Sequence, residues 1–155
     1  MPFMLSELSA RHSVSSLVGQ WGFYQGETNG CSCHGEGVAR FHNGDITRGQ
    51  FNEHQVEGLA VTVCADGTCV SGMHRCGKLH GAGVHTDSDG TLTYGNWIDG
   101  VYSGPNPDAL NVAVQAETIA AGISLRLSNR NSFVGSGIGK IFQALGCISL
   151  IASVK

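Results

Sequence analysis

Residues 70–92 read VSGMHRCGKLHGAGVHTDSDGTL, and the same spacing of glycines returns every 23 residues on either side of this stretch. Three columns of glycines share the period: Gly26, Gly49, Gly72 and Gly95; Gly35, Gly58, Gly81 and Gly104; and Gly44, Gly67 and Gly90. A fixed period of about 20 to 50 residues is typical of repeat architectures. The sequence therefore divides into units at 24–46, 47–69 and 70–92, with a shorter fourth unit at 93–105.

Turn dipeptides predict that each unit folds as one β-hairpin. These dipeptides are Asn29-Gly30, Asn43-Gly44, Asp66-Gly67, Asp89-Gly90 and Asp99-Gly100. They favour type I′ turns, because both central residues of such a turn need positive φ. First strands are expected at 24–28, 47–51, 70–74 and 93–97, and second strands at 35–41, 58–64 and 81–86. The predicted fold class is all-β, an antiparallel meander of successive hairpins.

Glycines and aromatic residues are expected to share one face of this sheet. Side chains alternate along a strand, so Tyr24 and Gly26 lie on the same face. Glycine weakens a strand unless its missing side chain lets a ring or another backbone come close. We therefore predict that rings of one unit stack over glycines of the next, with Gly72 and Gly81 beneath neighbouring rings.

Aligned on the glycines, the units follow the pattern Y-x-G-x-[WF]-x-x-G-x-x-H-G-x-G-V, which ends in Asn-Gly or Asp-Gly. This pattern resembles the MORN repeat (membrane occupation and recognition nexus), and the resemblance covers Tyr24 to about Gly104. It implies an elongated array of about 3.5 repeats, to which the sequence after Pro105 adds a helical C-terminal appendage. It also implies a non-catalytic scaffold or adaptor for protein–protein interaction at cytoskeletal or ciliary structures. The alternative that it implies is a membrane-associated module, bound to phospholipid or anchored by its tail.

Aromatic residues of the array are the candidate binding residues: Tyr24, Phe51, Tyr94, Trp97 and Tyr102. Trp97, supported by Tyr94 and Tyr102, is the favoured contact, because the fourth unit alone combines the tryptophan with further aromatic residues beside an acidic turn. Aromatic rings dominate the binding energy of many interfaces. Two alternatives stay open: Trp97 is a core residue that covers a neighbour's glycine, or the helix expected after the array folds over it.

Patterns of enzyme chemistry are missing from the sequence. There is no G-x-S-x-G and no H-E-x-x-H, and residues 135–140 lack the first glycine of a phosphate-binding loop. Cys31-Ser32-Cys33-His34 looks like half a zinc site, but the spacing of Cys64 and Cys69 does not supply the other half. We predict no catalytic residue, no metal and no cofactor, with reduced cysteines in a cytoplasmic protein as the favoured state over zinc ligation or a disulfide.

Charge argues against nucleic acid as a partner. Residues 24–105 hold nine acidic and four basic residues, a net charge of −5, and the four basic residues are scattered. Nucleic-acid binding needs clustered lysine and arginine, and binding to anionic lipid also draws on basic residues. A protein of unknown identity is therefore the expected partner of the repeats.

Residues 1–23 carry no signal-peptide pattern. We expect a disordered or loosely helical cap there, in which apolar residues cover the first hairpin: Leu5, Leu8, Leu17, Val18 and Trp21. An organelle-targeting role is the alternative. In either case this segment lies outside the repeat array.

Residues 106–155 form a second flanking segment with helical and apolar signals. Apolar residues recur at helical spacing: Val112, Ala116, Ile119, Ala120, Ile123 and Leu127. We expect this helix to dock onto the open edge of the last hairpin, or else to bind a partner or self-associate. The apolar run at 141–154 is shorter than the roughly 20 residues that cross a bilayer. It is therefore expected to be buried, to contact lipid through 138–155, or to form a terminal strand.

Overall fold

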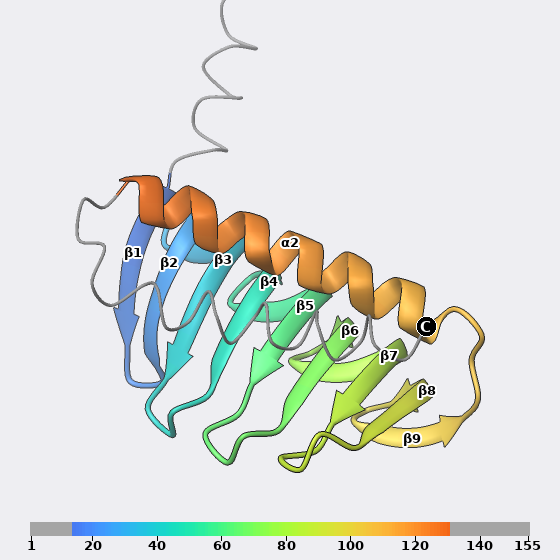
Figure 1. Cartoon of the computed structure of the whole chain (residues 1–155). Helices are drawn as coiled ribbons and strands as arrows, with labels where there is room; N and C mark the ends of the chain where they lie inside the picture. Colours follow the sequence, from blue (N-terminus) through green and yellow to red (C-terminus); the bar gives the residue numbers. More distant parts are fainter. Residues whose placement is uncertain (1–13, 131–155) are drawn as a thin grey trace, which may run out of the picture.

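The computed structural model describes residues 14–130, which form one antiparallel sheet covered by one helix (Figure 1). The strands follow the chain order across the sheet: β1 Val14–Gly19, β2 Gly22–Asn29, β3 Ser32–Phe41, β4 Ile46–Asn52, β5 Gln55–Val63, β6 Cys69–Arg75, β7 Lys78–Thr86, β8 Leu92–Ile98 and β9 Val101–Gly104. The helix is α2, Ala109–Arg130. The predicted hairpin meander with a helical appendage is confirmed, and between residues 30 and 95 the structure contains no helix.

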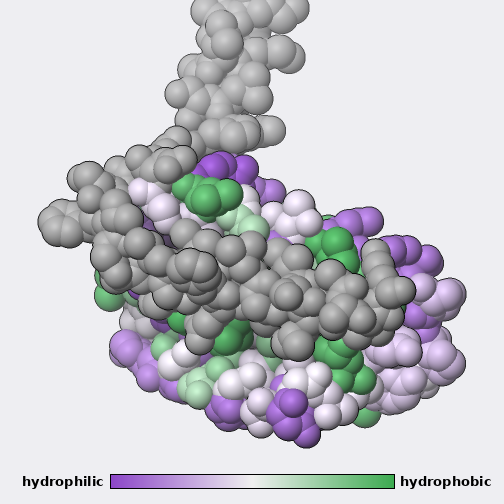
Figure 2. All heavy atoms as spheres, in the orientation of Figure 1, coloured by the Kyte–Doolittle hydropathy of each residue, from purple (hydrophilic) through white to green (hydrophobic). Residues whose placement is uncertain are grey.

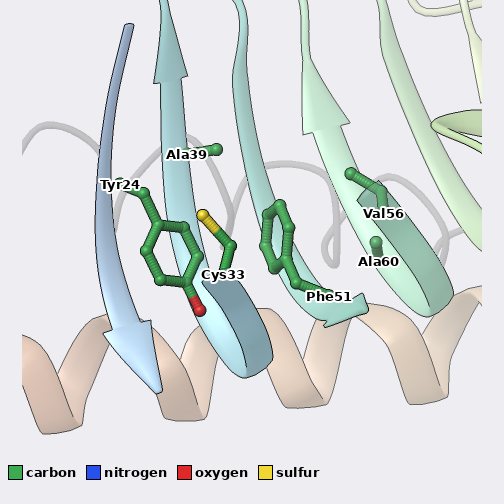
Figure 3. Packing of buried hydrophobic residues seen from close by; sticks show 6 residues of the cluster. All are labelled: Tyr24, Cys33, Ala39, Phe51, Val56 and Ala60. Carbon is green, nitrogen blue, oxygen red and sulfur yellow. The ribbon is translucent and has the colours of Figure 1, made fainter. Parts of the chain in front are cut away.

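The two faces of the sheet differ in what covers them. Strand alternation and pairing place Tyr24, Phe51 and Trp97 on one face, which we call the ring face. Figure 3 shows the largest buried cluster on this face, in which the Tyr24 and Phe51 rings pack near Val56 and Ala60. The other face, which we call the helix face, packs its buried side chains against α2. The core is therefore split into two layers, one on each side of the sheet.

The helix lies across the helix face and not at the open edge of the last hairpin, where the sequence predicts it. It contacts the strands from β3 to β8 and runs back toward the start of the sheet (Figure 1). Its buried side contains four alanines, Ala109, Ala113, Ala116 and Ala120, together with Glu117, Ile123 and Ser124. Small side chains let the helix axis approach the sheet, so the apolar stripe predicts a buried side but not the surface that receives it.

A strand begins the sheet where the sequence predicts a disordered or helical cap. Strand β1 pairs with β2, and Leu17 lies opposite Tyr24 and packs against the cluster on the ring face. Trp21 stacks at a tilt on Phe41, with ring centroids 5.9 Å apart, whereas Val18 is exposed. Residues 14–23 are therefore part of the sheet. Leu5 and Leu8 lie outside the described residues.

One β-bulge recurs with the repeat and explains Gly35, Gly58 and Gly81 of the second column of glycines. In the β4–β5 hairpin, pairing steps from Gly49↔Ala60 to Phe51↔Val56, so three residues of β5 face one residue of β4. Gly58 stands in this bulge with φ +103°, a backbone conformation that favours glycine. The Gln50 side chain accepts a hydrogen bond from the Leu59 N–H of the bulge at 2.8 Å.

The same bulge corrects the prediction that Gly72 and Gly81 lie beneath rings. Gly81 is the bulge glycine of the third hairpin, and a Cβ there would meet Met73 at 3.4 Å. At Gly72 a Cβ would lie 2.5 Å from the backbone of Ala82 and Gly83. Rings do cover other glycines of the array, since the Tyr24 ring lies over Gly37. The glycines of the first column therefore serve close approach of two backbones more than stacking of rings.

The turns at the two ends of the sheet have different conformations. Asp99-Gly100 has positive φ at both residues, as the type I′ prediction requires. At Asp66-Gly67 only the glycine has positive φ, because the Asp66 carboxylate accepts a hydrogen bond from the Thr68 N–H at 2.9 Å and forms a longer turn. The prediction of type I′ turns is therefore wrong for Asp66-Gly67 and for the equivalent Asn43-Gly44 and Asp89-Gly90. It is also wrong for Asn29-Gly30, where only the glycine has positive φ.

Candidate functional site

Three of the five predicted binding residues are buried in the structure. Tyr24 and Phe51 form an edge-to-face pair with ring centroids 5.0 Å apart (Figure 3). The Tyr24 hydroxyl donates a hydrogen bond to the carbonyl of Glu27 at 2.7 Å, and burial raises the pKa of this hydroxyl far above its usual value. These two rings therefore stabilise the sheet and offer no surface to a partner.

Trp97 is also a core residue, with only 7% of its surface exposed. Its indole N–H donates to the carbonyl of Gly83 at 3.0 Å, and its ring meets Tyr102 edge-to-face at 5.5 Å. Tyr102 is directly opposite Trp97 in the β8–β9 pair, whereas Tyr94, three positions earlier on β8, points to the other face. The structure thus brings Trp97 and Tyr102 together and separates Tyr94 from them.

Four of the eight exposed large hydrophobic side chains among the described residues lie together on the last two strands, whereas Val18, Trp21, Met73 and Leu125 are dispersed over other elements. The members are Tyr94 (48% exposed), Ile98 (51%), Val101 (69%) and Tyr102 (45%), which we call the C-terminal edge surface. Tyr94, Ile98 and Val101 lie on the helix face and Tyr102 lies on the ring face, so this surface wraps around the edge of the sheet. In the described part of the chain no strand follows β9, so nothing covers this edge as the next hairpin covers earlier ones. On the coloured part of Figure 2, hydrophobic residues otherwise form separate patches among hydrophilic ones.

Sequence reasoning missed Ile98 and Val101, although a signal was present. Both flank the Asp99-Gly100 turn in the last unit, and no further hairpin of the array follows them. At the rim of this surface, the Asp99 carboxylate lies 3.8 Å from the Arg75 guanidinium, and both groups are exposed. An apolar centre beside a charged rim is the usual composition of a protein-binding patch.

A buried carboxyl group lies between the helix and the sheet. Glu117 on α2 is completely buried, and its carboxyl accepts a hydrogen bond from the Ser71 hydroxyl of β6. Its second oxygen has no hydrogen-bond partner in the described part of the structure. Burial raises the pKa of Glu117 to about 7, although the Ser71 bond and the positive charge of Arg48 act in the opposite direction.

Glutamine in place of Glu117 is expected to stabilise the protein at about pH 8 and to change little below about pH 4.5. Because folding raises the pKa from 4.5 to about 7, stability present below pH 4.5 is lost as the pH rises through this window. The complete shift corresponds to about 3 kcal/mol in the free energy of unfolding. Urea unfolding of both proteins across this range measures the effect, and equal stability at pH 8 would contradict it.

Cysteine and histidine side chains do not converge on one centre. Cys31 is exposed at a turn, whereas Cys33 is buried on the ring face and His34 is exposed beside it. Within residues 14–130 no three histidine, cysteine, aspartate or glutamate side chains are arranged to hold a metal ion. In the same part of the chain no two cysteines are joined in a disulfide, and Cys147 lies outside the described residues.

Comparison with known proteins does not assign this chain to a family. No protein-family model matches the sequence, and none of the curated proteins is significantly similar to it. Function is therefore inferred from the geometry of the described residues and from the resemblance of the repeat unit.

Proposed function

We propose that this chain is a non-catalytic scaffold, similar to MORN-repeat proteins, which binds a protein partner through the C-terminal edge surface. The observation that carries the proposal is the concentration of exposed apolar side chains on β8 and β9. Elsewhere the repeat packs its own rings, since Tyr24, Phe51 and Trp97 lie inside the sheet. Partner contact must then come from side chains that the packing leaves exposed.

The chemistry of this surface favours a protein over other partners. Tyr94 and Tyr102 each offer a large apolar ring with a polar hydroxyl, a residue type enriched at interface centres. The array is net acidic, which disfavours nucleic acid and anionic lipid. Attachment at the end of a continuous hydrogen-bonded sheet holds the surface rigidly, and a rigid surface loses little conformational entropy on binding.

We also propose that the protein is located in the cytoplasm, at cytoskeletal or ciliary structures, because the resemblance of the repeat implies this location. The membrane-associated alternative rests on residues 138–155, which lie outside the described residues. Among residues 14–130, no helix has the length and apolar character needed to cross a bilayer. No observation on the described residues favours the membrane-associated alternative.

Replacing Ile98 and Val101 together by threonine is expected to weaken partner binding about tenfold or more. Threonine keeps the β-branched shape that suits a strand but removes apolar surface, and loss of a central apolar contact commonly costs about 1 kcal/mol or more. Proteins captured from a cell extract by the wild type and the variant are quantified by mass spectrometry. The captured protein whose amount differs most between the wild type and the variant is then purified. Its dissociation constants for the two proteins are measured by calorimetry.

Val18→Thr is the matched control for this experiment. Val18 is another exposed valine, on β1 at the opposite edge of the sheet. The control is expected to bind like the wild type, and both variants should keep the melting temperature of the wild type. Equal binding by the Ile98→Thr/Val101→Thr variant would place the interaction elsewhere on the molecule.

A further inference from the structure

The contact between α2 and the sheet is made by four buried alanines together with Ile123, while Leu110 and Val114 are partly buried beside them. Ala113 packs near Val84, and Ala116 and Ala120 pack with Val61 and Cys69. An alanine methyl buries little apolar surface, and hydrophobic stabilisation scales with the area buried. The strands, in contrast, are joined to one another by continuous hydrogen-bonded ladders that do not involve the helix. The helix is therefore the more weakly attached layer of the two.

The centre of this weakly attached layer contains the carboxyl group of Glu117. It is one of the largest completely buried side chains in the described structure, and one of its oxygens lacks a hydrogen-bond partner there. A buried polar atom without a partner costs free energy, and such atoms in natural proteins call for a specific explanation. A glutamine or leucine would fill the same volume without an ionisable group, so packing alone does not explain the residue.

We propose that α2 is a releasable cover of the helix face and that ionisation of Glu117 sets how often the cover lifts. When α2 is docked, the carboxylate is withdrawn from water and its charge is disfavoured. When α2 lifts, the carboxylate is solvated and the charge is tolerated. Ionisation therefore favours the lifted state, and protonation favours the docked state. Burial raises the pKa of the docked carboxyl to about 7, which places the change near neutral pH.

Few other charged or titratable groups face Glu117. From β4 comes Arg48, which is itself buried, and its positive charge favours the ionised carboxylate and partly opposes release. From β6 come the Ser71 hydroxyl and the Cys69 thiol. From β5 and β7 come the apolar side chains of Val61 and Val84, and β8, which also contacts the helix, places Tyr94 on the same face of the sheet. Glu117 is thus the buried carboxyl of this contact, and Glu36 of β3, paired with Arg126 of α2, is a second carboxyl at its surface.

The connections of α2 allow it to move without unfolding the sheet. The helix is joined to β9 by residues 105–108, which include Pro105 and Pro107 and lie outside the strands. A second polar contact, between Arg126 and Glu36 of β3, lies on the surface, with the Arg126 side chain 63% exposed. Exposed ion pairs contribute little stability. Lifting α2 leaves the nine strands paired and opens the helix face to solvent.

Hydrogen exchange of the full-length protein tests the proposal. Protection factors of the α2 amides, from about Ala113 to Ala120, are compared with those of β5 amides between about pH 5 and pH 8. If α2 lifts locally, its protection factors fall by tens of fold over this range and level off above the raised pKa, while those of β5 change much less. Exchange of α2 only together with β5 at every pH would overturn the proposal.

Two variants identify the group responsible. In Glu117→Gln the α2 protection factors should become independent of pH and exceed those of the wild type at about pH 8. Glu36→Gln removes the other carboxyl that contacts α2, and its pH dependence should match that of the wild type. A Glu117→Gln protein with the wild-type pH dependence would overturn the assignment of Glu117 as the switch.

Discussion

Alanine in place of Gly72 is expected to destabilise the protein by about 4 kcal/mol. A Cβ at this position would lie 2.5 Å from the Ala82 carbonyl oxygen and 2.5 Å from the Gly83 Cα, which are backbone atoms and cannot rotate away. Overpacking of this kind costs about 1–3 kcal/mol. The φ of +148° adds strain for any residue with a side chain. Urea unfolding at fixed pH measures the loss.

Gly104→Ala separates crowding from backbone strain. Gly104 has nearly the same φ, +151°, but a Cβ there would meet no atom within 4 Å. Gly104→Ala should therefore lower the free energy of unfolding only through backbone strain, by about 1 kcal/mol. If Gly72→Ala costs no more than Gly104→Ala, then β6 and β7 have room to separate, and the first column of glycines is not explained by close approach of two strands.

The 23-residue period predicted the strands because glycine spacing and turn dipeptides are local signals. The expected first strands at 24–28, 47–51, 70–74 and 93–97 all lie within observed strands. Turn conformation was harder to predict, because Asp66 uses its side chain to form a longer turn, whereas Asp99 does not. Both residues precede a glycine, so the dipeptide alone does not distinguish the two turns.

The packing of α2 could not be predicted from its own residues. Apolar spacing identifies which side of a helix is buried, but the receiving surface lies far away in the sequence, at residues such as Val61 and Val84. Glu117 was missed for a related reason. Its place next to Ala116 on the buried side is visible in the sequence, yet its burial depends on Ser71, 46 residues earlier.

The repeat pattern also failed to predict which residues of the C-terminal edge surface are exposed. The repeat pattern marks Trp97 because it occupies a column of the template, and a template column records a packing role as readily as a binding role. Val101 carries no template signal, since it lies at the end of the array, and it is the most exposed member of the C-terminal edge surface. Among residues 14–130 no further hairpin pairs with β9, which leaves Val101 exposed, and a pattern shared by all units does not encode where the array ends.

Replacing Trp97 by alanine is expected to cost about 3–5 kcal/mol of stability, the usual range for removing a large buried aromatic side chain. The ring packs against Tyr102 and lies near His85, with centroid distances of 5.5 and 6.0 Å. The substitution also removes the indole N–H that donates a hydrogen bond to the Gly83 carbonyl. The melting temperature and the urea midpoint should therefore both fall strongly.

Two further substitutions decide whether Trp97 acts in the core or at the surface. Trp97→Phe keeps an aromatic ring and loses the hydrogen bond to Gly83, so it should cost about 1–2 kcal/mol. Tyr102→Ser changes a half-exposed ring and should weaken partner binding more than it weakens the fold. If Trp97→Ala instead abolishes binding while the free energy of unfolding changes by less than about 1 kcal/mol, Trp97 is a contact residue, and its burial in the described structure is relieved when the partner binds.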